Sequence, residues 1–213
     1  MSQQAPVILV FSLGEGLQQA IFQDLYGRLM QKIEQKATVK EAWNTQEALD
    51  LINGDSKAEA IFVTETPALS PPETASCRIS SSIVLGCAFS STIRPSDLRG
   101  YFNKKWNLPW KQGSYHRTTV TLNQTAEKVP TGRVPSSYSQ KAVFLADVDK
   151  TAAWYLPTND SVTESHVFPA APVPTSETPV ACAKMGNGWL GYIGDVNAEE
   201  GTDDVVLAML GVP

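Results

Sequence analysis

The sequence is poor in the residues from which disulfide frameworks and metal centres are built. Its three cysteines, Cys77, Cys87 and Cys182, are too widely spaced for a disulfide framework or a zinc motif. The two histidines are too few for a histidine-rich metal site. The glycines of the first turn, Gly14 and Gly16, fit neither a phosphate-binding loop nor a dinucleotide fingerprint. We therefore expect no metal and no cofactor.

An excess of positive charge and a long apolar run are also missing. The formal net charge is −5 and no basic cluster stands out, which excludes a nucleic-acid binder that works by neutralising phosphates. The longest apolar run near the N-terminus, residues 7–11, is too short for a membrane span or a signal-peptide core. We expect a cytoplasmic protein with a small-molecule partner and neither nucleic acid nor a membrane as partner, and the oligomeric state stays open.

Short apolar runs alternate with helical patterns in the first half of the chain. Residues 7–11, 60–63 and 82–85 are continuous apolar runs typical of strands buried on both faces, and residues 37–42 form a weaker one. Between them, apolar residues recur every fourth position from Leu17 to Ile33, and Asn44 with Glu47 resembles a capping box. This order predicts a mainly parallel α/β sheet flanked by helices.

The second half is richer in antiparallel signals. Strands are expected at residues 118–122, 142–145 and 154–156, and a hairpin at 180–184 and 189–193, whereas residues 124–139 are expected to form a loop. Pro95 suits the first turn of one helix, and Thr202 is expected to cap the last. We expect one α/β domain over residues 1–213.

The candidate binding residues follow strands. In open α/β sheets, ligands bind beyond the carboxyl ends of the strands, where strand order reverses. We therefore expect Ser12, Glu65, Cys87, Ser90 and Ser91 to share a cleft at this edge of the sheet. The further candidates for ligand binding are Arg117, Asp195 and Asn197.

Cys87 is the sharpest candidate for a reactive side chain, because it comes between a central strand and a turn. A helix N-terminus or a nearby imidazole would lower its pKa and make it a nucleophile. His116 or His166 could act as the base, with Glu164 orienting His166. The alternatives are a small core residue for Cys87, a strand-start histidine for His116 and a surface histidine for His166.

Several segments resemble a known family. Residues 89–91 (FSS), 106–110 (WNLPW), 113–119 (GSYHRTT) and 188–200 (GWLGYIGDVNAEE) look like those of a group of fungal proteins of unknown function. That group resembles the ThuA-like branch of the class I glutamine amidotransferase-like superfamily. The resemblance implies a flavodoxin-like sheet with helices on both faces, but fold does not fix function.

Amidotransferase chemistry is not expected, because the family's pattern is broken. True class I amidotransferases place the cysteine in a Gly-x-Cys-x-Gly elbow and pair it with a later His-x-Glu. Here Gly86 adjoins Cys87 directly, no glycine follows, and Glu164 precedes His166. We therefore expect a small-molecule-binding protein. The alternatives are a hydrolase or transferase that uses Cys87 with His116 or His166, and an interaction protein whose aromatic cluster at residues 106–115 meets a partner.

Overall fold

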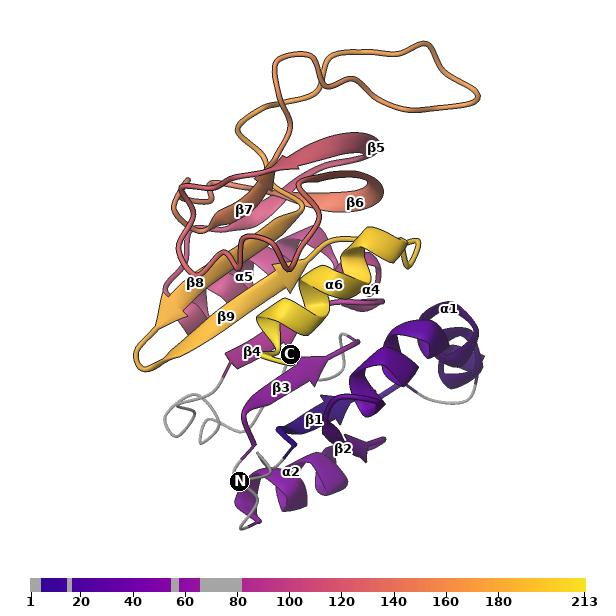
Figure 1. Cartoon of the computed structure of the whole chain (residues 1–213), viewed down its shortest axis with the longest axis vertical. Helices are drawn as coiled ribbons and strands as arrows, with labels where there is room; N and C mark the ends of the chain where they lie inside the picture. Colours follow the sequence, from indigo (N-terminus) through magenta and orange to yellow (C-terminus); the bar gives the residue numbers. More distant parts are fainter. Residues whose placement is uncertain (1–4, 15–16, 55–57, 66–81) are drawn as a thin grey trace.

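A nine-stranded sheet organises the chain (Figure 1). The structure is a computed structural model, and it describes residues 5–14, 17–54, 58–65 and 82–213. Across the sheet the strands run β2 (Thr38–Ala42), β1 (Val7–Phe11), β3 (Ala60–Val63), β4 (Ser82–Leu85), β9 (Gly188–Ile193), β8 (Val180–Met185), β7 (Ala153–Leu156), β5 (Lys111–Leu122) and β6 (Ser137–Ala146).

The sheet has a parallel half and an antiparallel half. The strands from β2 to β9 are mutually parallel, and those from β9 to β6 are antiparallel. All four residues of β3 are buried, as are the last four of β1 and the last three of β4. Burial on both faces explains why these strands are continuous apolar runs. The predicted mixed α/β architecture is confirmed.

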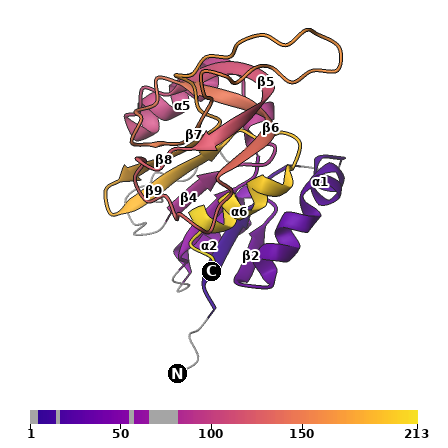
Figure 2. The ribbon, with the colours of Figure 1, turned by 45° about the horizontal axis from the view of Figure 1, so that its top comes forward.

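Five helices cover the two faces of the sheet in the described part of the chain. α1 (Leu17–Glu34) and α6 (Glu200–Met209) contribute to the core on one face. α2 (Thr45–Asn53), α4 (Phe89–Thr92) and α5 (Pro95–Trp106) contribute to the core on the other. Figures 1 and 2 show α6 lying across β4 and β9, with α1 beside it.

The apolar stripe predicted for α1 was wrong in its first half. Ile21 and Leu25 are 48% and 46% exposed, and the helix buries Phe22 and Tyr26 in their place, whereas Ile33 is buried as predicted. An α-helix has 3.6 residues per turn, so a repeat of four residues drifts by about 40° at each step. The stripe therefore leaves the buried face when it is followed back from Ile33.

The predicted cap of α2 is confirmed. The Asn44 side chain accepts a hydrogen bond from the backbone N–H of Glu47 at 3.0 Å, and the Glu47 carboxylate accepts one from the backbone N–H of Trp43 at 2.8 Å. Together the two side chains satisfy two of the free N–H groups at the helix start. Thr202 does not cap α6, because it lies within that helix.

The strands β5 and β6 are longer than expected. β5 begins at Lys111, and β6 begins at Ser137 within a stretch predicted to be loop. They form one long antiparallel ladder from Lys111 opposite Ala146 to Thr121 opposite Ser137. Most residues of β5 are exposed or half-buried, and such positions carry polar side chains. The apolar pattern that predicts a strand is therefore weak in the first half of β5.

The antiparallel half curls back onto the carboxyl end of β9. The backbone N–H of Val143 in β6 donates to the carbonyl of Gly194 at 2.9 Å, and that of Val196 donates to Lys141 at 3.0 Å. A Cβ atom on Gly194 would lie 2.0 Å from the carbonyl oxygen of Val143, so only glycine allows this approach. The curl brings β5 and β6 to the edge where the parallel strands end.

No helix in the described ranges has the length and apolar character needed to cross a membrane.

Candidate functional site

Four buried polar residues directly follow the carboxyl ends of parallel strands. Ser12 follows β1, Glu65 lies just beyond β3, Cys87 just beyond β4 and Asp195 just beyond β9. Their exposed fractions are 1%, 4%, 4% and 2%. Because neighbouring parallel strands end at the same edge, these side chains share one edge of the sheet. We call this group the strand-end cluster.

A pair of hydroxyl groups joins two of these strand ends. The Ser12 hydroxyl oxygen lies 2.7 Å from that of Thr64, and the Thr64 hydroxyl donates to the carbonyl of Phe11 at 3.1 Å. Since the single hydroxyl proton of Thr64 is used there, Ser12 is the donor of the pair. Thr64 was not among the predicted site residues, since its one signal in the sequence is its place at the end of an apolar run.

Glu65 is a buried carboxyl group with spare hydrogen-bonding capacity. Burial raises its pKa, and a hydrogen bond from the backbone N–H of Gly14 partly opposes the rise. Its Oε2 atom has no hydrogen-bond partner among the described residues. Buried polar atoms are nearly always paired, so such an oxygen calls for an explanation.

Cys87 has the backbone of a strand-to-helix elbow but not the electrostatics of a nucleophile. Its φ of +53° is rare for a residue with a side chain. Burial raises the pKa of its thiol well above the ordinary value, and the carboxyl groups of Asp195, Asp203 and Glu65 raise it further. The expected lowering is therefore reversed, because α4 is a single short turn of helix and the surrounding charges are negative.

The cavity beside Cys87 is almost closed. Its volume is about 10 Å³, close to the minimum for one water molecule. Asp195 lines it together with Cys87, and the remaining lining comes from α1, α6, the turn before α6 and Ile193 at the end of β9. Neither His116 nor His166 is among its lining residues. The structure therefore brings Cys87 and Asp195 together, but it places no imidazole at their cavity.

Asp195 has a structural role in the turn that leads to α6. Its carboxylate accepts hydrogen bonds from the backbone N–H groups of Asn197 and Glu199, both at 2.8 Å. Burial raises its pKa, and these two hydrogen bonds oppose the rise. Asn197 is exposed and contributes its backbone to the turn, and Ala198 has a φ of +53°.

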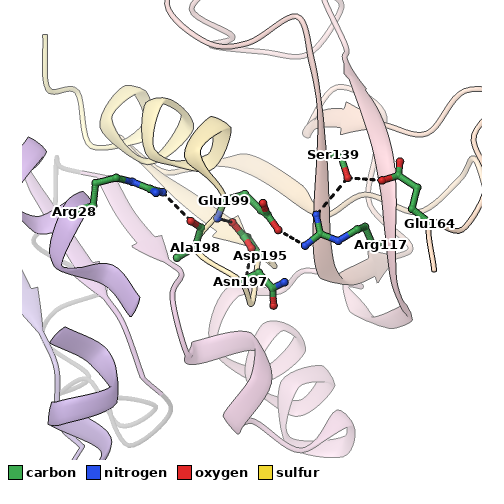
Figure 3. Close-up of polar contacts among 8 residues, drawn as sticks. All are labelled: Arg28, Arg117, Ser139, Glu164, Asp195, Asn197, Ala198 and Glu199. Atoms are coloured by element: carbon green, nitrogen blue, oxygen red, sulfur yellow. Dashed lines mark hydrogen bonds and ion pairs between the residues drawn. The ribbon is translucent and has the colours of Figure 1, made fainter. Parts of the chain in front are cut away.

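A polar network holds this turn from both sides (Figure 3). On one side, the Arg28 guanidinium in α1 donates to the carbonyl of Ala198 at 2.7 Å. On the other side, Arg117 in β5 forms an ion pair with Glu199 and donates to the hydroxyl of Ser139 at 3.4 Å. Arg117 is therefore engaged within the protein and does not point into the cavity at Cys87.

Glu164 and His166 do not form the expected pair. The Glu164 carboxylate accepts hydrogen bonds from the hydroxyls of Ser139 at 2.5 Å and Thr119 at 2.7 Å. His166 is exposed on the long connection between β7 and β8. Glu164 thus anchors this connection to β5 and β6, and does not orient an imidazole.

His116 lies on β5, with its ring stacked on Phe144 at 4.4 Å between ring centres. Burial lowers its pKa, and the Glu177 carboxylate opposes the change. Its Nε2 atom has no partner within the described ranges. His116 pairs across the ladder with Ala142, which in turn bridges to Asp195, so the curl of the sheet brings β5 toward the strand-end cluster.

The two serines of α4 have separate roles. Ser90 is buried, and its hydroxyl donates to the carbonyl of Gly194 at 3.3 Å, which ties α4 to the end of β9. Ser91 is exposed, and its hydroxyl donates to the carbonyl of Ala88 at 3.1 Å. Of the two serines, only Ser90 contacts a strand end.

A second, larger pocket lies near the carboxyl end of β8. Its volume is about 190 Å³, and its walls are mostly apolar. It is lined by Leu108, Pro109, Trp110, Glu127, Asp149, Thr151, Ala152, Cys182, Ala183 and Lys184. Trp110 is only 1% exposed and packs on Phe102, so this member of the expected aromatic surface belongs to the core. This pocket was not predicted from the sequence, because segments far apart along the chain form its walls.

The described residues contain no group of three or more His, Cys, Asp or Glu side chains suited to hold a metal ion. The site's chemistry is that of buried hydroxyl and carboxyl groups.

Comparisons with known proteins identify the fold. No family model and no curated protein matches the chain. Among solved structures, it is similar to a protein from Parabacteroides merdae described as ThuA-like, with a TM-score of 0.58 and 10% identity over 98% of this chain and 89% of that one. It is also similar to a protein from Bacteroides uniformis described as ThuA-like. The TM-score is 0.56 and the sequence identity is 9%, over 98% of this chain and 92% of that one.

The chain is also similar to part of a β-galactosidase from Halorubrum lacusprofundi. The TM-score is 0.53 and the identity 19%, over 99% of this chain but only 31% of the galactosidase. At these identities the likeness is one of fold. The chain therefore has a mixed α/β fold like that of these two proteins described as ThuA-like.

Proposed function

We propose that this chain is a ThuA-like protein of the class I glutamine amidotransferase-like superfamily, with a flavodoxin-like parallel half, that binds a small neutral polar molecule at the carboxyl edge of its sheet. We further propose that it has no amidotransferase activity. The shared fold supports the first part. The observation that carries the binding role is the buried Oε2 atom of Glu65, which has no hydrogen-bond partner among the residues that the structure describes.

A ligand would account for this oxygen. A buried carboxyl group without its partners costs free energy, and a bound hydroxyl or amide group would restore the missing hydrogen bond. Because burial raises its pKa, Glu65 can also be protonated and donate to a carbonyl or hydroxyl oxygen. The Thr64 hydroxyl at the same strand end and the Ser12 hydroxyl at the neighbouring end of β1 are further buried polar groups at this edge.

The charges at this edge favour a neutral ligand. The groups at or near the strand-end cluster are the carboxyls of Glu65, Asp195 and Asp203, all of which act on Cys87. Arg28 and Lys32 are paired with Asp203, and Arg117 is paired with Glu199. A polyol or a primary amide therefore fits better than an anion.

The state of Cys87 supports the absence of amidotransferase activity. Glutamine hydrolysis by a cysteine needs a thiolate and a base within hydrogen-bond reach. Here burial holds the thiol protonated and no histidine lines its cavity.

The proposal is tested by thermal-shift screening of neutral polyols and amides, followed by calorimetry. We expect a compound that raises Tm in the wild type and in Glu65→Gln, which keeps hydrogen-bonding groups, but not in Glu65→Leu. Glu41→Gln is the matched control, because Glu41 is a partly buried glutamate of raised pKa on the edge strand β2. Binding that survives Glu65→Leu, or steady release of ammonia from glutamine, would contradict the proposal.

A second candidate is a hydrolase or transferase that uses Cys87 with His116 or His166. The observation that favours it is the φ of +53° at Cys87, since strained elbows between a strand and a helix expose nucleophiles in other folds. Alkylation by iodoacetamide at neutral pH separates the two. The candidate requires Cys87 to react faster than Cys182, which is equally buried, whereas the binding proposal predicts slow alkylation of both.

A further inference from the structure

The connection between β7 and β8 forms a projecting arm, which we define as residues 158–176. In Figures 1 and 2 it extends away from the antiparallel half of the sheet, at the opposite end of the molecule from α2. Its base is fixed to β5, because the Thr118 hydroxyl donates to the carbonyl of Val162 at 2.7 Å and the backbone N–H of Glu164 donates to the carbonyl of Arg117 at 2.8 Å.

The arm has internal structure. The backbone N–H of Thr163 donates to the carbonyl of Ala171 at 2.8 Å, and Val162 forms a bridge with Pro172. At its tip, the Ser165 hydroxyl oxygen accepts hydrogen bonds from the backbone N–H groups of Val167 at 3.1 Å and Phe168 at 3.0 Å. The tip is therefore held in one conformation before any partner is bound.

This ordered tip presents apolar side chains to water. Val167 is 81% exposed and Phe168 is 73% exposed, the highest values among the exposed large apolar residues of the described chain. Their exposure does nothing for the stability of their own chain. An aromatic side chain on a preorganised hairpin is instead typical of an interface anchor, since little conformational freedom is lost on binding.

The pocket near the carboxyl end of β8 has the size and character to receive this anchor. Its volume is about 190 Å³, and Leu108, Pro109, Trp110 and Ala183 give it mostly apolar walls. An apolar cavity of about 150 Å³ binds benzene in another protein, so a phenyl ring fits this space. Glu127 and Asp149 also line the pocket, and the N–H of a histidine can donate to either.

A chain cannot fill its own pocket with its own arm. Tyr155, next to the start of the arm, pairs with Val180 at the amino end of β8, whereas Lys184 of the pocket lies four residues further along that strand. Four residues of strand span roughly 13 Å, and the arm leads away from β8. Figures 1 and 2 both show the far end of the arm and the arrowhead of β8 on opposite sides of the molecule.

We propose that the arm of one copy docks on a second copy of this chain, with Phe168 seated in the pocket beside Trp110 and His166 donating to Glu127 or Asp149. If two copies exchange arms reciprocally, the contact gives a two-fold symmetric dimer; if each arm binds the next copy in one direction only, the contact is heterologous and gives a closed ring or an open filament. This inference rests on the arm and the pocket, and is independent of the proposed ligand at Glu65.

Sedimentation velocity over a range of protein concentrations tests the proposal. We expect concentration-dependent association of the wild type, weakened roughly 30-fold in Phe168→Ala, the usual loss when a buried aromatic anchor is truncated. Leu25→Ala is the matched control, because it removes a large exposed apolar side chain from α1 and should leave association unchanged. Both substitutions are on the surface, so both variants should keep the wild-type Tm.

Photocrosslinking locates the contact. With p-benzoylphenylalanine at position 168, we expect crosslinks between copies that map to residues 108–110 or 182–184. A chain that stays monomeric at every concentration would overturn the proposal. So would association that Phe168→Ala leaves intact, or crosslinks that map only to other surfaces.

Discussion

Glu65 and Asp195 are both buried carboxylic acids at the ends of parallel strands, yet they are satisfied in different ways. Burial raises the pKa of each. Asp195 accepts two backbone hydrogen bonds within its own turn, whereas Glu65 keeps one oxygen without a partner among the described residues.

The comparison separates structure from function at one edge of the sheet. The hydrogen bonds of Asp195 account for its burial, and they fix the start of α6. Glu65 accepts one hydrogen bond from the backbone N–H of Gly14, and its Oε2 atom has no partner in the described part of the chain, which is why we assign binding to the side of the cluster near β1 and β3. The two acids should therefore respond differently to substitution, and four experiments examine this difference, starting with the largest expected effect.

Gly194→Ala should strongly destabilise the protein, because the added Cβ would lie 2.0 Å from the carbonyl of Val143 and displace the turn that holds Asp195. We expect a loss of about 3 kcal/mol or more in the free energy of unfolding, measured in urea. Gly27→Ala in α1 is the control, since nothing lies within 4 Å of its added Cβ and alanine favours a helix by about 1 kcal/mol. Equal effects of the two would contradict the close approach of β6 to β9.

Asp195→Ala should cost roughly 2–4 kcal/mol in the free energy of unfolding, because it leaves the N–H groups of Asn197 and Glu199 without their acceptor. Glu65→Gln should change the same quantity by less than about 1 kcal/mol, since it replaces a carboxyl group that is only partly paired. Urea unfolding of the two variants measures both. If Glu65→Gln is the more damaging change, Glu65 has a structural role that we have not assigned.

Arg117→Ala should cost about 1 kcal/mol, because its ion pair with Glu199 is only partly buried. The loss should largely disappear in the background of Glu199→Ala, which removes the same pair. A double-mutant cycle by chemical denaturation measures this coupling. A coupling energy of zero would show that Arg117 does not hold the turn, and would leave it free to contact a ligand.

Stability should depend on pH through Glu65. Its folded-state pKa is raised above the ordinary 4.5, so the folded state holds the proton where the unfolded state has released it. Stability from this group is therefore greatest below pH 4.5 and falls as the pH rises through the folded-state pKa. The wild type should lose more stability over this window than Glu65→Gln, as measured by unfolding at a series of pH values. Parallel curves for the two proteins would show that the pKa of Glu65 is not raised.

Much of the parallel half could be predicted from the sequence. Strands such as residues 60–63 are buried on both faces, so their composition alone marks them. The beginning of β6 at Ser137 was missed, because half-buried and exposed positions in a long hairpin carry polar residues that look like loop. The curl of the sheet that brings Val143 to Gly194 depends on contacts between segments that are far apart in the sequence. A local sequence pattern therefore cannot predict it.

The candidate site was only partly predictable. Position after a strand placed Ser12, Glu65 and Cys87 at one edge, as the structure has them, whereas Asp195 joins them because β9 pairs in parallel with β4, which the hairpin pattern did not predict. The electrostatics of Cys87 were not predictable, because they depend on burial and on Asp195 and Asp203, which are far away in the sequence. Pairing of a histidine with Glu164 was inferred from adjacency, but the fold directs that carboxylate to Ser139 and Thr119.

The most direct test of the binding claim is a carbon-13 NMR titration of the Glu65 carboxyl group, with and without the compound selected by thermal-shift screening. We predict a pKa above 4.5 in the free protein and a further change in that pKa on binding, with the Asp195 signal much less affected. An ordinary pKa for Glu65 that the bound compound leaves unchanged would contradict the assignment of the ligand to this edge.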